Sequence, residues 1–411
     1  MAFTLFRSPK TLEDIMKSGL ARKSFNAIKT LLTRKLLIEC DQIPYEFYHL
    51  PIKKILNWIL VETSTLLKPE KPWGWPTHLQ IEPSTRCNLR CAFCPVTTGL
   101  DRPAGHMTSD IFKKAIDEIG DYLFLILLWD WGEPFLNPAI YEMIAYAKQR
   151  DIKIVSSTNG HVFAKGDHAE RLVRSGIDTI IFAVDGIDQE TYEQFRIGGD
   201  IKTVLAGIEK VAVAKHALNS PTPIINFRFL VMKHNEHEVP RLEAFTKSLG
   251  VNVLTLKTLN PYDQGECANT KTDGLKFIPQ TSHYQRFEYD ERDGSRIRLK
   301  RNPCKRLWNN PVLHWDGKIS PCTFDPHDNY AIGDLARQSF KEIWMGIPFA
   351  QLRHQFRKDY QKMSLCVDCT NAFKGGYLGD SIVEASFFNP SEKGMGRSSK
   401  RALPRETQSN D

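Results

Sequence analysis

The chain has 411 residues, of which 41% are hydrophobic and 25% are charged, and its formal net charge is +7. This is the composition of an ordinary soluble globular protein, and the length allows two or three domains. The longest apolar run, residues 122–129, is too short to span a bilayer, and residues 1–20 lack the features of a signal peptide. These features argue against a membrane-spanning protein, and we expect a cytoplasmic location.

Residues 1–76 are expected to form a helical N-terminal extension. Residues 21–40 place apolar side chains at helical spacing among basic ones, and residues 51–67 repeat this pattern. Such an extension either packs on the next domain or lies as a basic amphipathic element on an anionic membrane surface. Peripheral membrane contact through residues 21–67 therefore stays open. Nucleic-acid binding is not expected, because the basic residues are not interleaved with exposed aromatic ones.

Strand and helix patterns alternate over residues 77–260. The predicted strands are residues 78–82, 124–130, 152–157, 179–184, 224–231 and 251–257, and the predicted helices are residues 109–119, 139–150, 167–175, 203–216 and 236–249. Such alternation predicts parallel βα units. In a barrel of these units the chemistry lies at the carboxyl ends of the strands.

Three cysteines follow the first of these strands with the spacing Cys-x3-Cys-x2-Cys: Cys87, Cys91 and Cys94. A [4Fe–4S] cluster normally takes four cysteines. A group of three therefore leaves one iron open to a ligand that is not protein. The alternative is a zinc site with a distant fourth ligand such as His106.

The segment from Cys87 to Cys94 resembles the cluster-binding loop of the radical S-adenosylmethionine (radical SAM) enzymes. Three further segments, each after a later predicted strand, resemble SAM-contacting segments of that family: Gly132-Glu133-Pro134, residues 157–160 and residues 183–186. A zinc site gives no reason for these segments to be present. The resemblance implies an α/β fold with a partial (β/α)6 barrel over residues 77–260. It also implies that a [4Fe–4S] cluster binds SAM and cleaves it reductively to a 5′-deoxyadenosyl radical.

The same resemblance implies a role for each matching residue. The thiolates of Cys87, Cys91 and Cys94 would ligate the SAM-binding cluster. The residues that would contact SAM are Phe93 near the adenine, Gly132, Glu133 and Pro134 at the amino group, and Ser157, Asn159, Asp185 and Arg196 at the ribose or carboxylate. Such an enzyme needs a low-potential electron donor such as a flavodoxin or ferredoxin.

A second set of cysteines follows a linker and hairpin over residues 261–303. Residues 312–320 predict another hairpin, because Asp316-Gly317 is a strong two-residue turn signal. Four cysteines lie around this hairpin and after a predicted helical stretch: Cys304, Cys322, Cys366 and Cys369. Residues 304–373 resemble the SPASM/twitch modules of radical SAM proteins, which implies an auxiliary [4Fe–4S] cluster; a structural zinc site is the alternative. Residues 374–411 are expected to be a disordered tail.

A fully ligated second cluster favours net oxidation, because it can accept an electron from a substrate radical. We therefore predict a radical SAM oxidoreductase that dehydrogenates a small or sugar-like molecule. Three different reactions stay open: maturation of a ribosomal peptide, modification of a lipid-linked substrate, and redox-neutral epimerisation. Epimerisation needs a hydrogen donor, and Cys267, in the loop after the last strand of the barrel, is the candidate. The substrate itself cannot be identified from these motifs.

Overall fold

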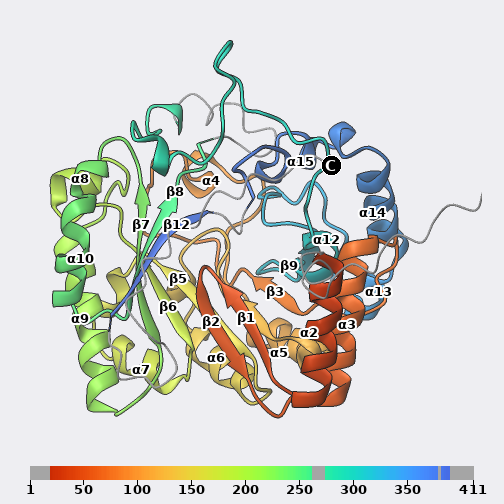
Figure 1. Ribbon diagram of the computed structural model, residues 1–411. Coiled ribbons are helices and arrows are strands. Elements are labelled where there is room, and N and C mark those ends of the chain that lie inside the picture. The colour runs from red at the N-terminus through yellow and green to blue at the C-terminus, as the bar shows by residue number, and fades with distance from the viewer. Residues whose placement is uncertain (1–18, 262–273, 378–380, 389–411) are drawn as a thin grey trace, which may run out of the picture.

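The structure is a computed structural model that describes residues 19–261, 274–377 and 381–388 (Figure 1). Its main feature, within these residues, is a ten-stranded sheet with the order β11-β10-β9-β3-β4-β5-β6-β7-β8-β12. The first six strands of this sheet in the sequence are β3 (His78–Ile81), β4 (Leu125–Leu127), β5 (Lys153–Thr158), β6 (Thr179–Ala183), β7 (Ile224–Val231) and β8 (Val253–Thr258). They run parallel to one another, as the sequence predicts.

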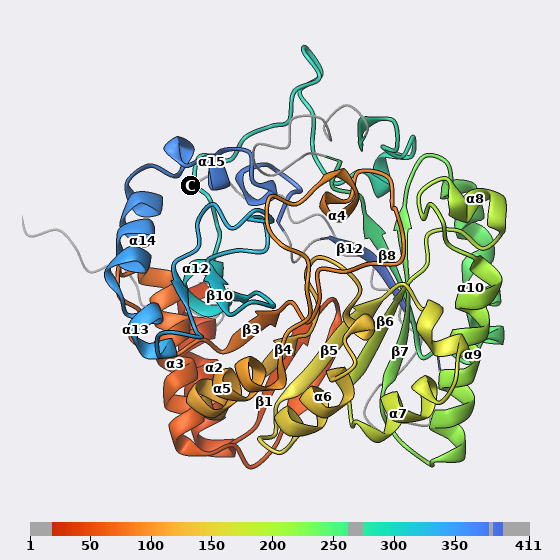
Figure 2. The same cartoon turned by 180° about the vertical axis from the view of Figure 1, so that it is seen from behind.

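Helices cover one face of this sheet, here called the outer face (Figures 1 and 2). They are α5 (Ser109–Ile119), α6 (Ile140–Lys148), α7 (His168–Arg174), α9 (Ile201–Ala217) and α10 (Val239–Ser248). Alternate residues of each strand face these helices; in β7 they are Ile225, Phe227 and Phe229, all buried in the main core. The predicted α/β architecture of a partial barrel is therefore confirmed.

The N-terminal extension differs from the all-helical expectation. Helix α2 (Gly19–Thr33) ends where Arg34 takes a positive φ of 55°, and the chain then forms a hairpin of β1 (Leu36–Cys40) and β2 (Ile43–Phe47). The predicted helix over residues 21–40 is therefore wrong beyond Thr33. The physical reason is packing, because Tyr45 and Phe47 are buried against β4, β5 and β6 on the inner face of the sheet. The second predicted helix is present as α3 (Ile52–Leu67).

The C-terminal tail also contains structure that was not expected. Strand β12 (Ile382–Phe387) pairs antiparallel with β8, so the expectation of disorder over residues 374–411 is wrong for these residues. Pairing covers the edge that β8 would otherwise leave open. The side chain of Gln42, at the tip of the hairpin, donates a hydrogen bond to the carbonyl of Ile382 at 2.6 Å.

The predicted hairpin after Cys304 is present and extends the sheet on its other side. Strands β9 (Val312–Leu313), β10 (Lys318–Ser320) and β11 (Gly333–Asp334) pair antiparallel, and β9 also pairs in parallel with β3. Four helices complete this part of the chain: α12 (Arg306–Asn309), α13 (Phe340–Trp344), α14 (Ile347–Asp359) and α15 (Ser364–Val367). A further short helix, α4 (Pro95–Thr98), follows the first cysteines. The two cysteine-bearing regions therefore belong to one continuous sheet.

Candidate active site

The loop with the first three cysteines leaves the carboxyl end of β3 and is fastened to the segment after α8 (Gln189–Glu193). Backbone amides of Arg90 and Ala92 donate to the carbonyls of Ile197 and Phe195, at 3.0 Å each. Cys91 is buried, while Cys87 and Cys94 are half-buried. Burial, together with the charge that the Cys91 thiolate would carry, raises the pKa of Cys94 to about 12. Thiols desolvated in this way become stable thiolates only when a cation joins them.

A fixed positive charge lies against this loop. Arg196 forms a salt bridge with the buried Asp185 at 2.6 Å, and its Nη1 lies 3.6 Å from the sulfur of Cys91. Asp185 is held in turn by the backbone amide of Leu230, which donates to its second oxygen at 2.9 Å. The structure thus brings together Arg196, Asp185 and the cysteine loop, which the sequence analysis assigned to one SAM site.

Glu133 is committed to bonds within the protein. Its carboxylate accepts hydrogen bonds from the Thr158 hydroxyl at 2.8 Å and from the backbone amides of Asn159 at 2.8 Å and Phe135 at 3.2 Å. Burial raises its pKa to about 7. The preceding Gly132 has φ +89°, and a Cβ there would lie 2.3 Å from the Ser84 carbonyl oxygen. The Gly132–Pro134 turn is therefore fixed. The Glu133 carboxylate links this turn, which follows β4, to the carboxyl end of β5.

The remaining residues predicted to contact SAM are less closely connected. Asn159 donates to the side chain of Asn88 at 2.8 Å, and its Nδ2 lies 4.0 Å from the sulfur of Cys87. Ser157 lies half-buried near the carboxyl end of β5. Phe93 packs against Phe195 and Phe277 in a separate aromatic cluster, with ring centroids 5.4 and 5.7 Å away. Cys267 lies outside the described residues.

The second set of cysteines converges in the C-terminal part of the chain. Cys304, Cys322, Cys366 and Cys369 are all buried. Burial raises the pKa of Cys366 well above its usual value. Negative charge on Cys369, Cys304 and Cys322 would raise this pKa further, so the four thiols lie close enough to interact. Burial likewise raises the pKa of Cys369 to about 12, while the charge of Arg306 opposes this rise. Four converging, desolvated thiols are a donor set that fits a fully ligated cluster.

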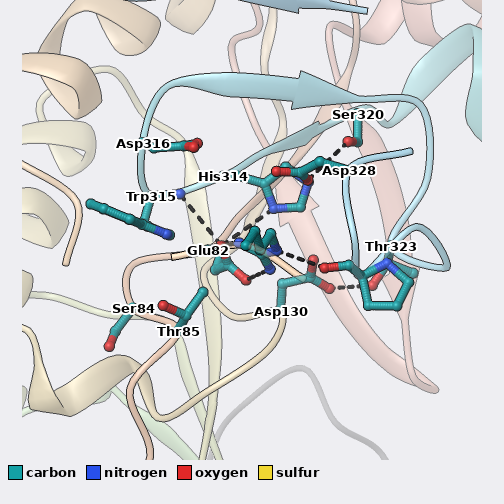
Figure 3. Close-up of polar contacts among 12 residues, drawn as sticks. Glu82, Ser84, Thr85, Asp130, His314, Trp315, Asp316, Ser320, Thr323 and Asp328 are labelled. Carbon is teal, nitrogen blue, oxygen red and sulfur yellow. Dashed lines mark hydrogen bonds and ion pairs between the residues drawn. The ribbon is translucent and has the colours of Figure 1, made fainter. Parts of the chain in front are cut away.

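A group of charged side chains that the sequence motifs did not predict lies between the two cysteine sets. Glu82, Asp130 and His314 each follow a strand, β3, β4 and β9 respectively, and their ligand atoms lie within 4.8 Å of one another (Figure 3). Arg102 donates to both oxygens of Glu82, at 2.7 and 2.5 Å. His314 lies 3.3 Å from Glu82 and 3.1 Å from Asp328.

Arg102 makes this group an ion-pair network rather than a metal site. Burial would raise the pKa of Glu82, but hydrogen bonds from Arg102 and His314 hold it below its usual value. Burial also disfavours the charged form of His314, but the hydrogen bond to Glu82 and the surrounding carboxylates raise its pKa. Glu82, Asp130 and His314 each follow a strand, and this position is the one sequence signal that could have identified them.

Asp130 differs from the rest of this network. Its Oδ1 accepts a hydrogen bond from the Gln80 side chain at 2.9 Å. The same oxygen accepts a hydrogen bond from the Thr323 hydroxyl (Figure 3). Its Oδ2 is buried, with no hydrogen-bond partner in the part of the chain that the structure describes. Burial, reinforced by the charge of Glu82, raises the pKa of Asp130 to about 7. Because Thr323 directly follows Cys322, this carboxyl group lies beside the second cysteine set.

Two family models match the chain: the Radical SAM superfamily over residues 81–243, and the SPASM iron–sulfur cluster-binding domain over residues 304–370. The chain is similar to a tungsten-containing aldehyde ferredoxin oxidoreductase cofactor-modifying protein of Pyrococcus furiosus, with 25% identity over 71% of this chain and 87% of that protein. It is also similar to an AdoMet-dependent heme synthase of Methanosarcina barkeri, with 25% identity over 66% of this chain and 82% of that protein.

Among solved structures, Streptococcus suis SuiB has a similar fold. The TM-score is 0.51 at 16% identity, and the match covers 82% of this chain and 80% of SuiB. Likeness at this level of identity concerns the fold alone.

Proposed function

The chain is a radical SAM enzyme with a SPASM domain, and we propose that its reaction is a net oxidation of a small or sugar-like molecule. The three thiols of Cys87, Cys91 and Cys94 would hold the SAM-binding [4Fe–4S] cluster, and Cys304, Cys322, Cys366 and Cys369 would hold the auxiliary one. When bound, the first cluster supplies the electron that cleaves SAM to the 5′-deoxyadenosyl radical, and the second supplies an acceptor for one electron.

The residues of the chain position SAM in this proposal. The Gly132–Pro134 turn presents backbone groups to the amino end of SAM, because the Glu133 carboxylate is already committed to Thr158 and Asn159. Arg196, oriented by Asp185, would bind the carboxylate of SAM or its ribose. Ser157 and Asn159 would complete the polar contacts and Phe93 the adenine contact.

The observation that carries the oxidation is Asp130 Oδ2, which has no hydrogen-bond partner among the described residues and lies beside the second cysteine set. A substrate that loses a hydrogen atom and then an electron must also release a proton. Asp130 Oδ2 is buried and has no partner among the described residues, and the pKa of this carboxyl group is about 7, so it suits a proton acceptor near neutral pH. In this proposal the substrate C–H hydrogen would leave with 5′-deoxyadenosine and Asp130 would take up the proton. The cluster held by Cys304, Cys322, Cys366 and Cys369 would supply the acceptor for the electron.

The first test is the cofactor content and the mass change of the substrate. Anaerobically reconstituted protein should hold about eight irons, and changing Cys87, Cys91 and Cys94 together to Ala should leave about four. Incubation with SAM, a reductant and a small-molecule extract of the source cells should yield a metabolite lighter by two hydrogens, formed with 5′-deoxyadenosine. Zinc at the second site, or a turned-over metabolite without a mass change in H2O, would refute the oxidation.

A lipid-linked or membrane-proximal substrate is the second candidate. It is supported by the exposed apolar side chains of α2 and α3, among them Phe25 (53% exposed), Leu32 (80%) and Ile52 (60%). Basic residues such as Lys29 and Lys53 lie in the same region. None of the described helices is long and apolar enough to cross a membrane, so the proposal concerns surface contact only.

Peptide maturation and epimerisation are weaker candidates. SuiB has been solved with its precursor peptide SuiA, but a 16% identical relative supports the fold rather than the substrate. Epimerisation depends on Cys267, which lies outside the described residues. A low-potential donor such as a flavodoxin or ferredoxin would supply the electron in every case.

A further inference from the structure

A group of positively charged side chains lies next to the N-terminal hairpin, on the inner face of the sheet, which is the face opposite the helices. Strand alternation places Asn226 and Arg228 of β7, and Thr255 and Lys257 of β8, on the face opposite the helices, because the residues between them face the helical core. Arg228 donates to Asp41 at 2.6 Å. Asp41 belongs to the turn between β1 and β2, so the hairpin supplies the carboxylate that balances Arg228.

Two cations of this group form no ion pair with a carboxylate among the described residues. Within the described residues, the Lys257 side chain forms no hydrogen bond or ion pair, and the Arg306 side chain donates a hydrogen bond only to the uncharged Gln80, at 3.1 Å. Both side chains interact electrostatically with Asp41 and Cys40, which shows that they converge on the hairpin turn. Both are half-buried, so a ligand can reach them and water only partly screens them.

Uncompensated charge in such a place is costly to the protein unless a ligand balances it. Burial and the nearby Arg228 lower the pKa of Lys257 to about 8, which reflects this cost. A neighbouring polar atom, Gln42 Oε1, is also buried with no partner among the described residues. Gln42 lies beside Lys257, because its side chain donates to Ile382, the β12 residue that pairs with Lys257. Charged and uncharged groups that lack partners therefore gather at one place on the inner face.

Gln80 connects this place to the proposed proton acceptor. Its Oε1 accepts from Arg306, and its Nε2 donates to Asp130 at 2.9 Å. A substrate group held by Arg306 would thus lie one side chain away from Asp130. We propose that Lys257 and Arg306 form a subsite that binds an anionic group of the substrate, a carboxylate or a phosphate. This inference rests on the proposed function, since it specifies the substrate class of the same reaction.

The test uses reconstituted holoenzyme with saturating SAM, so that the SAM site itself is filled. Inorganic phosphate and, separately, succinate are titrated calorimetrically at constant ionic strength. A charge-assisted contact should make Lys257→Met and Arg306→Gln bind the preferred anion about tenfold more weakly. Lys257→Arg keeps the charge and should bind as the wild type does. The matched control is Lys202→Met, which removes an exposed lysine from α9 and should not change binding.

The pH dependence provides a readout that a misfolded variant would not reproduce. Besides Arg306, which lies at the same hairpin turn, the charged groups that act on Lys257 from neighbouring elements are Arg228, Asp41, Arg286 and Asp185. Anion binding by the wild type should weaken as the pH rises through about 8, because Lys257 then loses its proton, whereas binding by Lys257→Arg should stay constant. The subsite would be refuted if Lys257→Met and Arg306→Gln bound the anion as tightly as the wild type. It would also be refuted if they lost no more affinity than Lys202→Met does.

Failure of the proposed function would look different. If the wild type forms no 5′-deoxyadenosine from SAM and reductant yet binds phosphate or succinate through Lys257, the radical reaction is refuted and the subsite stands. If it cleaves SAM and binds neither anion, the subsite alone is refuted.

Discussion

Two carboxyl groups at the end of β4 share a pKa of about 7 but differ in what they can do. Both values are raised first by burial. The oxygens of Glu133 accept three hydrogen bonds from the chain, so this residue fixes a turn. Asp130 has one buried oxygen without a partner among the described residues, so it can take up a proton. Environment rather than residue type therefore separates the two roles.

Changing Asp130 to Asn should reduce the oxidised product formed per 5′-deoxyadenosine by about 100-fold, the usual contribution of a general base. In the wild type this ratio should rise with pH through about 7, because only the deprotonated carboxylate accepts a proton. The variant should show no such rise. Mass spectrometry of both products across this pH range measures the ratio. Asp316→Asn, in the neighbouring hairpin turn, is the matched control, and an unchanged pH profile in Asp130→Asn would refute the assignment.

Cys267 and Cys366 distinguish oxidation from epimerisation. An oxidation that uses the auxiliary cluster should be crippled by Cys366→Ala and nearly unaffected by Cys267→Ala. Epimerisation should show the reverse dependence, and its product should gain one deuterium from D2O through the exchangeable thiol. Deuterium incorporation that disappears in Cys267→Ala would overturn the oxidation in favour of epimerisation. Mass spectrometry of the product in D2O decides between them.

The chemistry-bearing residues differ in how far the sequence reveals them. The cysteine sets have a spacing that specifies their chemistry, and both family models match there. The pairs around Glu82 have no such signal, because Arg102 is 20 positions away and His314 is 232 positions away. Such contacts arise from strand order, which local patterns do not encode.

At the scale of elements, the parallel strands were predictable because continuous apolar runs alternate with amphipathic helices. The hairpin β1–β2 was not, since its turn is Asp41-Gln42 rather than a typical Asn-Gly or Asp-Gly pair. Residues 36–40 also fit a helical stripe as well as a strand, and only burial against β4 and β5 selects the strand. Strand β12 was missed because it pairs with β8 across more than 120 positions, which no local pattern indicates.

Helices α2 and α3 should determine whether the protein binds membranes. If they contact a lipid surface, the full-length protein should co-sediment with anionic liposomes, and binding should weaken as salt rises because basic residues contribute. Leu32→Ser together with Ile28→Ser, both exposed on α2, should reduce the bound fraction several-fold. Val213→Ser on α9, also exposed, is the control. Absence of binding at low salt would leave these helices as a structural extension only.

At the scale of the whole molecule, the barrel and the auxiliary-cluster domain share one sheet. β9 pairs with β3, so the strand that precedes the first cysteine loop is hydrogen-bonded to the strand between Cys304 and Cys322. The Glu82 network joins the same two regions through side chains (Figure 3). Two features therefore fix the distance between the two cysteine sets: the pairing of β3 with β9 and the buried ion pairs around Glu82.

Mutations in the Glu82 network, which joins the two cysteine-bearing regions, should be among the most destabilising in the protein. Arg102→Met leaves Glu82 buried beside His314 without its main partner, so the free energy of unfolding should fall by about 3–5 kcal/mol, as for other buried pairs that lose one member. The matched control is Arg174→Met, which breaks the exposed Arg174–Glu170 pair and should cost about 0–1 kcal/mol.

The stabilisation by this network should also depend on pH. Because the pKa of Glu82 is held below its usual value, the contribution of Glu82 to stability is present at neutral pH and lost in acid. The difference between wild type and Arg102→Met should therefore shrink as the pH falls. Equal denaturation midpoints for the two arginine variants at neutral pH would show that this network does not hold the domains together.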